Sequence, residues 1–96
     1  MELKLLVNNE EKTFTVPFIK ARAFRRALEI NKEVDFKNIS PEMLDTIVDY
    51  IAEVFNFQFT RDEFYDGLST DDLNSTIDYV MGKVIGNGKA SDGGKK

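Results

Sequence analysis

Two short stretches near the amino terminus alternate apolar and polar residues, whereas most of the remaining chain repeats apolar residues at helical spacing. Residues 2–7 and 12–16 have the composition and alternation typical of strands. The turn between them begins at Asn8, a residue type that tolerates positive φ. Pro17 ends the second strand, because proline has no N–H for a strand ladder. A hairpin over residues 2–16 is therefore predicted, and since an isolated hairpin is only marginally stable, it should pack on helices or pair with another chain.

The rest of the chain carries the composition, the apolar stripes and the end signals of helices. Ser40 offers a capping hydroxyl and Pro41 follows it at the first helical position, which together mark a helix start. Thr60 and Glu63 have the spacing of a capping box. Four helices are expected, over about residues 18–31, 41–55, 61–66 and 70–85.

The length of 96 residues suits one domain. Residues 86–96 lack apolar periodicity and hold four of the six glycines, so they are predicted to form a flexible tail. Residues 1–85 are predicted to form a single α+β domain, mainly α-helical with a short amino-terminal β-hairpin.

The composition excludes several kinds of chemistry. The chain has no His and no Cys, which removes Ser-His-Asp and Cys-His catalysis, thiolate chemistry, disulfides and structural zinc. Residues 62–73 partly follow calcium-loop spacing, but Phe64 and Leu73 stand where oxygen ligands are needed. None of the acidic residues is matched in the sequence with a nucleophile or a Gly-rich phosphate loop. We therefore expect no catalytic residues, no metal site and no cofactor.

The hydropathy pattern indicates a soluble intracellular protein. No stretch approaches the roughly 18 apolar residues of a membrane span. The amino end lacks the apolar segment of a signal peptide. We expect no contact with a membrane.

The net charge of −4 hides a strong asymmetry. Residues 1–41 carry eight basic against six acidic residues, whereas residues 42–78 carry ten acidic residues against one arginine. The basic cluster either follows nucleic-acid phosphates or pairs with the acidic middle of the same chain or of a second copy. The second reading is favoured over nucleic-acid binding because the domain as a whole is acidic. The cluster consists of Lys20, Arg22, Arg25 and Arg26.

Six aromatic residues fall within 25 positions, and they have two interpretations. Ordinary core packing is the first; the second is that some of them form a groove or interface for a partner helix or a second subunit. The sequence does not divide the two sets. The residues are Phe55, Phe57, Phe59, Phe64, Tyr65 and Tyr79.

Three segments resemble the tail assembly chaperones of long-tailed bacteriophages and related prophages. They are residues 19–29, 49–55 and 57–68. The last contains the run Phe-x-Phe-Thr-x-Asp-x-Phe-Tyr-Asp-Gly-Leu, placed between an amphipathic helix and the final helix. Together with the hairpin, the resemblance covers roughly residues 2–85.

The resemblance implies a non-enzymatic chaperone in the cytoplasm of the infected host. Such proteins bind the long, mostly helical tape-measure protein, keep it soluble until the tail tube polymerises around it, and are absent from the mature virion. The family often makes a longer second product by ribosomal frameshifting near the end of the short reading frame, and the residues Gly93–Lys96 can be encoded by a G-then-A-rich slippery stretch. That longer form, or a second copy of this chain, is a further expected partner.

The residues expected to contact the partner are aromatic, with arginines forming a charged rim. They follow from the residue pattern, because the family supplies no fixed set of binding residues. Two other functions remain open: a nucleic-acid-binding regulator that uses the helix at 18–31, and a structural virion component such as a small tail or head-completion protein. The expected contact residues are Phe57, Phe59, Phe64, Tyr65, Arg22, Arg25 and Arg26.

Overall fold

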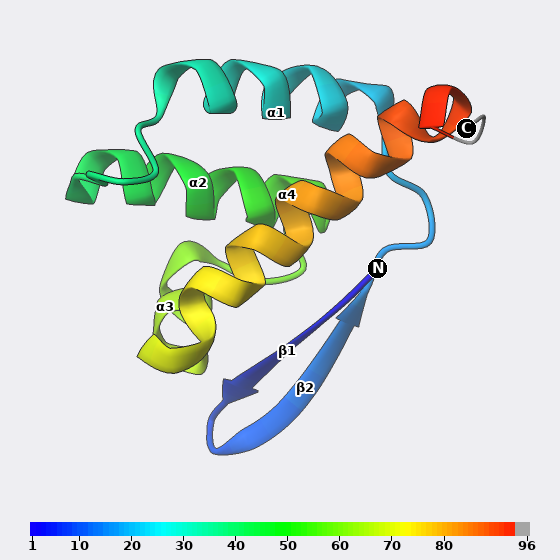
Figure 1. The fold of residues 1–96 in the computed structure, drawn as a ribbon. Helices are drawn as coiled ribbons and strands as arrows, with labels where there is room; N and C mark the ends of the chain where they lie inside the picture. The colour runs from blue at the N-terminus through cyan, green and yellow to red at the C-terminus, as the bar shows by residue number, and fades with distance from the viewer. Residues whose placement is uncertain (94–96) are drawn as a thin grey trace.

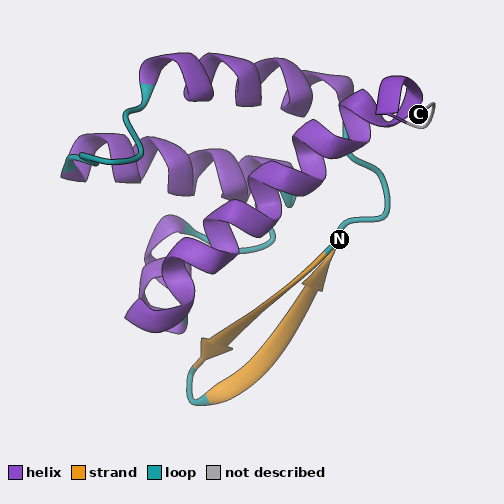
Figure 2. Cartoon of the chain, in the orientation of Figure 1, coloured by secondary structure: helices purple, strands orange, loops and turns teal. Residues whose placement is uncertain are grey.

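The chain folds as an amino-terminal hairpin beside a group of helices, as the sequence predicts (Figures 1 and 2). The computed structural model describes the backbone of residues 1–93 and the side chains of residues 1–86. Within that part of the chain, no helix is both long enough and apolar enough to cross a membrane. The elements are β1 (Glu2–Val7), β2 (Glu10–Thr15), α1 (Ala21–Glu33), α2 (Pro41–Val54), α3 (Arg61–Gly67) and α4 (Thr70–Gly93).

The two strands pair antiparallel around a turn made of two asparagines. Asn8 and Asn9 have φ values of 54° and 65°. Positive φ at both central residues is what a tight hairpin turn requires, and asparagine adopts it more readily than most residues. The register joins Val7 to Glu10, so β2 begins two residues earlier than predicted because the turn uses two residues instead of four.

The hairpin is fixed to the helices through its apolar face. Leu3 and Leu5 are buried, and the Phe14 ring lies edge-on to Phe59 with 5.1 Å between ring centroids. At the other edge, Gly67 lies so close to β1 that a Cβ atom there would be 2.8 Å from the carbonyl oxygen of Leu6. The end of α3 and β1 therefore pack backbone against backbone.

The helix α1 begins at Ala21, three residues later than predicted. Lys20 precedes it in an extended conformation and its side chain makes no capping hydrogen bond. Phe18 is exposed, so extending the helix back to it would bury no apolar surface. The predicted caps of the next two helices are present: Ser40 accepts from the Met43 N–H, and Thr60 forms a complete capping box with Glu63.

The last helix is longer than predicted. The helix α4 continues to Gly93, which corrects its expected end at residue 85, whereas residues 94–96 of the predicted tail lie outside the described residues. No proline interrupts residues 86–93, and a glycine in a helix interior costs only about 1 kcal/mol relative to alanine. Residues 86–93 include no large apolar side chain that would continue the apolar stripe of α4. Apolar periodicity in the sequence therefore could not indicate this part of the helix.

The core lies where α2 meets the other helices. One face of α2 is buried, including Ile47, Val48 and Ile51, and it packs against α1, α3 and α4. The chains of α1 and α2 run antiparallel, so the start of α1 lies beside the end of α2 (Figure 1). This arrangement positions the candidate site.

Candidate partner-binding groove

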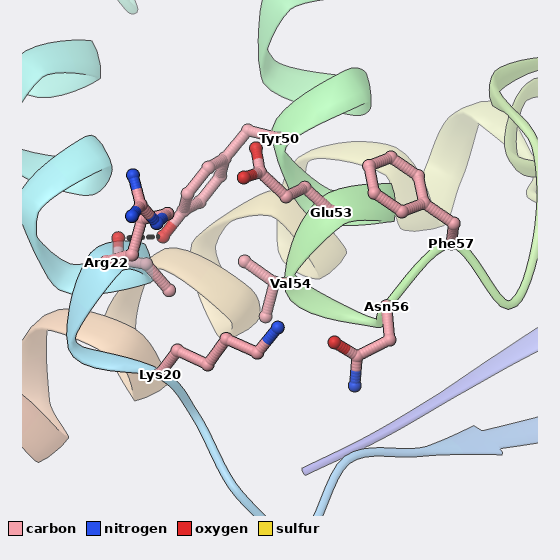
Figure 3. A pocket seen from close by; sticks show the side chains of 8 residues that line it. Lys20, Arg22, Tyr50, Glu53, Val54, Asn56 and Phe57 are labelled. Atoms are coloured by element: carbon pink, nitrogen blue, oxygen red, sulfur yellow. Dashed lines mark hydrogen bonds between the residues drawn. The ribbon is translucent and has the colours of Figure 1, made fainter.

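A pocket of about 190 Å³ lies where the start of α1 meets the end of α2 (Figure 3). A second, more open hollow adjoins it and shares Tyr50, Glu53 and Phe57 as lining residues. We call the two together the α1–α2 groove. The pocket is lined by Lys20, Arg22, Ala23, Tyr50, Glu53, Val54, Asn56 and Phe57; the second hollow adds Arg26, Thr46 and Asp49.

Phe57 is held at the groove by an unusual backbone. Asn56 and Phe57 both have φ of 57°, the left-handed region, and the Phe57 N–H donates to the carbonyl oxygen of Ala52 at 2.8 Å. This conformation costs an L-residue about 1–2 kcal/mol, although asparagine tolerates it better. The Phe57 side chain is 72% exposed. A strained backbone that presents an aromatic ring to solvent is a reason to look for a function there.

Tyr50 forms a rigid wall of the pocket. Its hydroxyl donates to the carbonyl oxygen of Ala23 at 2.6 Å, and the residue is only 2% exposed. Burial raises the pKa of Tyr50 to about 12, and the negative charge of Glu53 adds to the shift. The phenol therefore keeps its proton at neutral pH and holds the start of α1 against α2.

The cations of α1 differ in whether an acid neutralises them. Arg25 and Arg26 bind Glu29 at 2.9 Å and 3.1 Å, and the hydrogen bond from Arg26 is the main reason that the pKa of Glu29 is lowered. Within the described residues, Lys20 and Arg22 form no ion pair. These two side chains lie on the α1 side of the pocket, whereas Glu53 lies on the α2 side (Figure 3).

Two of the expected contact residues belong to the core instead. Phe59 is 2% exposed and Phe64 is fully buried. Their ring centroids are 6.1 Å apart, and Phe59 also packs against Phe55 at 5.5 Å. Both rings are therefore part of the core in this fold, and their contact with a partner stays a prediction.

Tyr65 takes part in a polar link between α3 and α2. Its hydroxyl donates to Asp45 Oδ1 at 2.6 Å. Arg61 binds Asp49 through two hydrogen bonds of 2.9 Å and 2.6 Å and lies 3.6 Å from Asp45. The pKa of Asp49 is lowered chiefly by this hydrogen bonding to Arg61. Tyr65 therefore helps to hold α3 against α2, and it does not line the α1–α2 groove.

Of the seven expected contact residues, the structure thus brings three to the α1–α2 groove. They are Arg22, Arg26 and Phe57, whereas Arg25 lies outside it. Sequence reasoning did not single out Tyr50 or Glu53, because nothing in a regular amphipathic helix marks which turn will border a groove. Among the described residues, no group of three or more His, Cys, Asp or Glu side chains is placed to hold a metal ion.

The chain is a small α+β domain whose surface carries a groove between α1 and α2. The chain belongs to the family of phage tail chaperone proteins, because the model of that family matches residues 1–96, the whole chain. This confirms the resemblance carried by the three segments. No curated protein and no solved structure gives a significant match to the chain.

Proposed function

We propose that this chain is a non-enzymatic tail assembly chaperone that binds the tape-measure protein and keeps it soluble in the host cytoplasm during tail assembly. Membership of the phage tail chaperone family supports a partner among phage tail proteins. The observation that carries the proposal is Phe57, an aromatic side chain held exposed beside a groove between two helices. A groove of this kind suits the apolar face of an amphipathic helix, which is what a long helical protein offers before the tail tube covers it.

The charge of the domain suits the same role. A net charge of −4 on a chain of this size favours solubility of whatever complex the chain forms. Phe57 is the exposed large apolar side chain that lines the groove; the other exposed ones among the described residues do not line it, and they are Leu6, Phe18, Leu28, Phe36 and Tyr79. The domain therefore covers an apolar helix while presenting charge to solvent.

The test is co-expression with the long tape-measure product, followed by affinity capture of this chain. We expect the partner to be insoluble when expressed alone and to co-purify when this chain is present. A longer frameshifted form of the chain should be assayed in parallel. If neither form captures or solubilises the partner, the proposed function is wrong.

The two other functions have less support in the structure. A nucleic-acid regulator would need the cations of α1, but Arg25 and Arg26 are engaged by Glu29. We expect no retention on DNA at physiological salt, where such contacts are strongly screened. A structural virion component would be found in purified particles, where we expect this chain to be absent.

A further inference from the structure

Lys20 and Arg22 are two positive charges at an apolar pocket, and no acidic side chain of the described residues pairs with them. The neighbouring cations Arg25 and Arg26 differ from them, because both form ion pairs with Glu29. A cation pair beside Val54 and Phe57 is therefore complementary to a ligand that is both apolar and acidic.

The size of the pocket limits the apolar part of that ligand to about one side chain. A cavity of about 150 Å³ lined by apolar side chains holds one benzene molecule. The pocket at the end of α2 measures about 190 Å³, with Ala23, Val54 and the Tyr50 ring as its apolar lining. One large aliphatic or aromatic side chain fits such a space.

We propose that the α1–α2 groove binds a helical segment of the partner in which a large apolar side chain stands one turn from a carboxylate. The apolar side chain enters the pocket beside Phe57, and the carboxylate meets Lys20 and Arg22. Residues three or four apart on a helix lie on the same face, about 5–6 Å apart, so one helix supplies both groups. The identity of the partner as a phage tail protein rests on the proposed function, whereas the chemistry of the bound segment rests on the groove.

A second copy of this chain does not supply such a segment from its described helices. Only Leu28 and Tyr79 are large apolar side chains exposed on a helix. One turn away, Leu28 has Arg25 and Lys32, and Tyr79 has Lys83, so both lack an acid at that spacing. The groove is therefore better matched to another protein than to itself.

Nucleic acid is also a poor match for the groove. Glu53 lies on the wall opposite Lys20 and Arg22 and would repel a phosphate backbone that runs through the groove. A single carboxylate held at the α1 side meets less of this repulsion than a run of phosphates does.

The test uses overlapping 20-residue peptides that cover the whole tape-measure product, with the full chain as the fluorescent probe. We expect the bound peptides to share a large apolar residue with Asp or Glu three or four positions away. The double variant Lys20→Glu, Arg22→Glu should weaken their binding at least tenfold. Its matched control is Lys32→Glu, Lys37→Glu, which changes the net charge equally at the other end of α1 and should leave binding within twofold.

Folding of both variants is checked by circular dichroism, and acidic residues at a helix start are favourable to that helix. Bound peptides with basic flanks, or equal losses in the two double variants, would overturn the proposal. So would a lack of peptide binding when the full-length partner is captured, and in that case the chaperone function itself would stand. Displacement of the peptides by duplex DNA would assign the groove to nucleic acid. If the peptide-free protein were an oligomer in solution and the variant Lys20→Glu, Arg22→Glu dissociated it, the groove would be assigned to a second copy of this chain.

Discussion

The Tyr50 hydroxyl donates a hydrogen bond of 2.6 Å to the carbonyl oxygen of Ala23, across 27 positions of the sequence. This bond joins the core helix α2 to the first turn of α1 and so fixes the width of the groove. We expect Tyr50→Phe to lower the free energy of unfolding by about 1–3 kcal/mol, because it leaves a carbonyl without its partner. Urea denaturation measures the change.

Tyr79→Phe is the matched control for that variant. Tyr79 is 39% exposed, and its hydroxyl accepts a longer hydrogen bond of 3.3 Å from the Glu2 N–H. We expect its removal to change stability by less than about 0.5 kcal/mol, as is usual for exposed sites. Equal effects of the two variants would mean that the bond to Ala23 does not fix α1.

We expect the exposed Phe57 to contribute to partner binding and not to the stability of the domain. Phe57→Gly relieves a positive φ at the expense of about 0.5–1 kcal/mol of chain entropy, so stability should stay unchanged or rise by up to about 1 kcal/mol. Capture of the partner should fall at least tenfold, because the exposed ring is lost. Denaturation and affinity capture on the same preparation measure both effects.

Phe64→Ala and Phe36→Ala are the buried and the exposed control for Phe57→Gly. Phe64 is fully buried, and its truncation should destabilise the domain by about 3–5 kcal/mol. Phe36 is 40% exposed in the connection after α1 and does not line the groove, so its truncation should leave capture nearly unchanged and cost much less stability than Phe64→Ala. If Phe57→Gly unfolds the domain, Phe57 supports the fold and is not a contact residue.

Gly67 should be intolerant of any side chain. A Cβ there would lie 2.8 Å from the Leu6 carbonyl oxygen and 3.0 Å from its nitrogen, both backbone atoms that cannot move without shifting β1. We expect Gly67→Ala to destabilise the domain by about 1–3 kcal/mol, as overpacking does. Gly82→Ala is the control: nothing lies within 4 Å, and a helical alanine should stabilise by about 0.5–1 kcal/mol. A neutral Gly67→Ala would show that the hairpin is loosely attached.

The raised pKa values of Tyr50 and Tyr65 predict that the domain loses stability in strong alkali. The pKa is raised to about 12 for both Tyr50 and Tyr65, from 10.0, mainly by burial and for Tyr65 also by its hydrogen bond to Asp45. Below pH 10 both the folded and the unfolded chain keep these protons, so their full contribution is present. Between pH 10 and about 12 only the unfolded chain releases them, and stability falls. Urea denaturation across this range should show a smaller fall for Tyr50→Phe; an identical fall would mean that Tyr50 ionises normally.

Local chemistry made the elements predictable, whereas packing between distant segments decided the site. The asparagine turn and the caps at Ser40 and Thr60 depend on neighbouring residues, and each appears where the sequence indicates. An extended Phe57-Gln58-Phe59 would have placed both rings on one face. The left-handed backbone at Asn56 and Phe57 instead turns one ring to solvent while the other enters the core.

The meeting of Arg22 and Phe57 was equally hidden from the sequence. They are 35 positions apart and come together only because α1 and α2 run antiparallel. The basic cluster and the aromatic segment were both visible as patterns, but no local rule says which members of each will border the same groove.

Glu53 weakens the preference of the groove for acidic ligands. It lies on the wall opposite Lys20 and Arg22, so its carboxylate opposes the binding of an acidic segment. Two unit charges 4 Å apart in water interact by about 1 kcal/mol, which corresponds to about fivefold in affinity. We expect Glu53→Gln to tighten binding of acid-flanked peptides by about two- to fivefold, measured by fluorescence anisotropy.

The control for this variant is Glu42→Gln, which removes the same charge from the first turn of α2, at the end of the helix away from the pocket. Screening over a Debye length of about 8 Å at physiological salt should make its effect small. The gain from Glu53→Gln should shrink as salt is raised, since it is a Coulomb effect. If Glu42→Gln tightens binding as much, the peptides respond to the net charge of the domain, and the carboxylate is not bound at the α1 side of the groove.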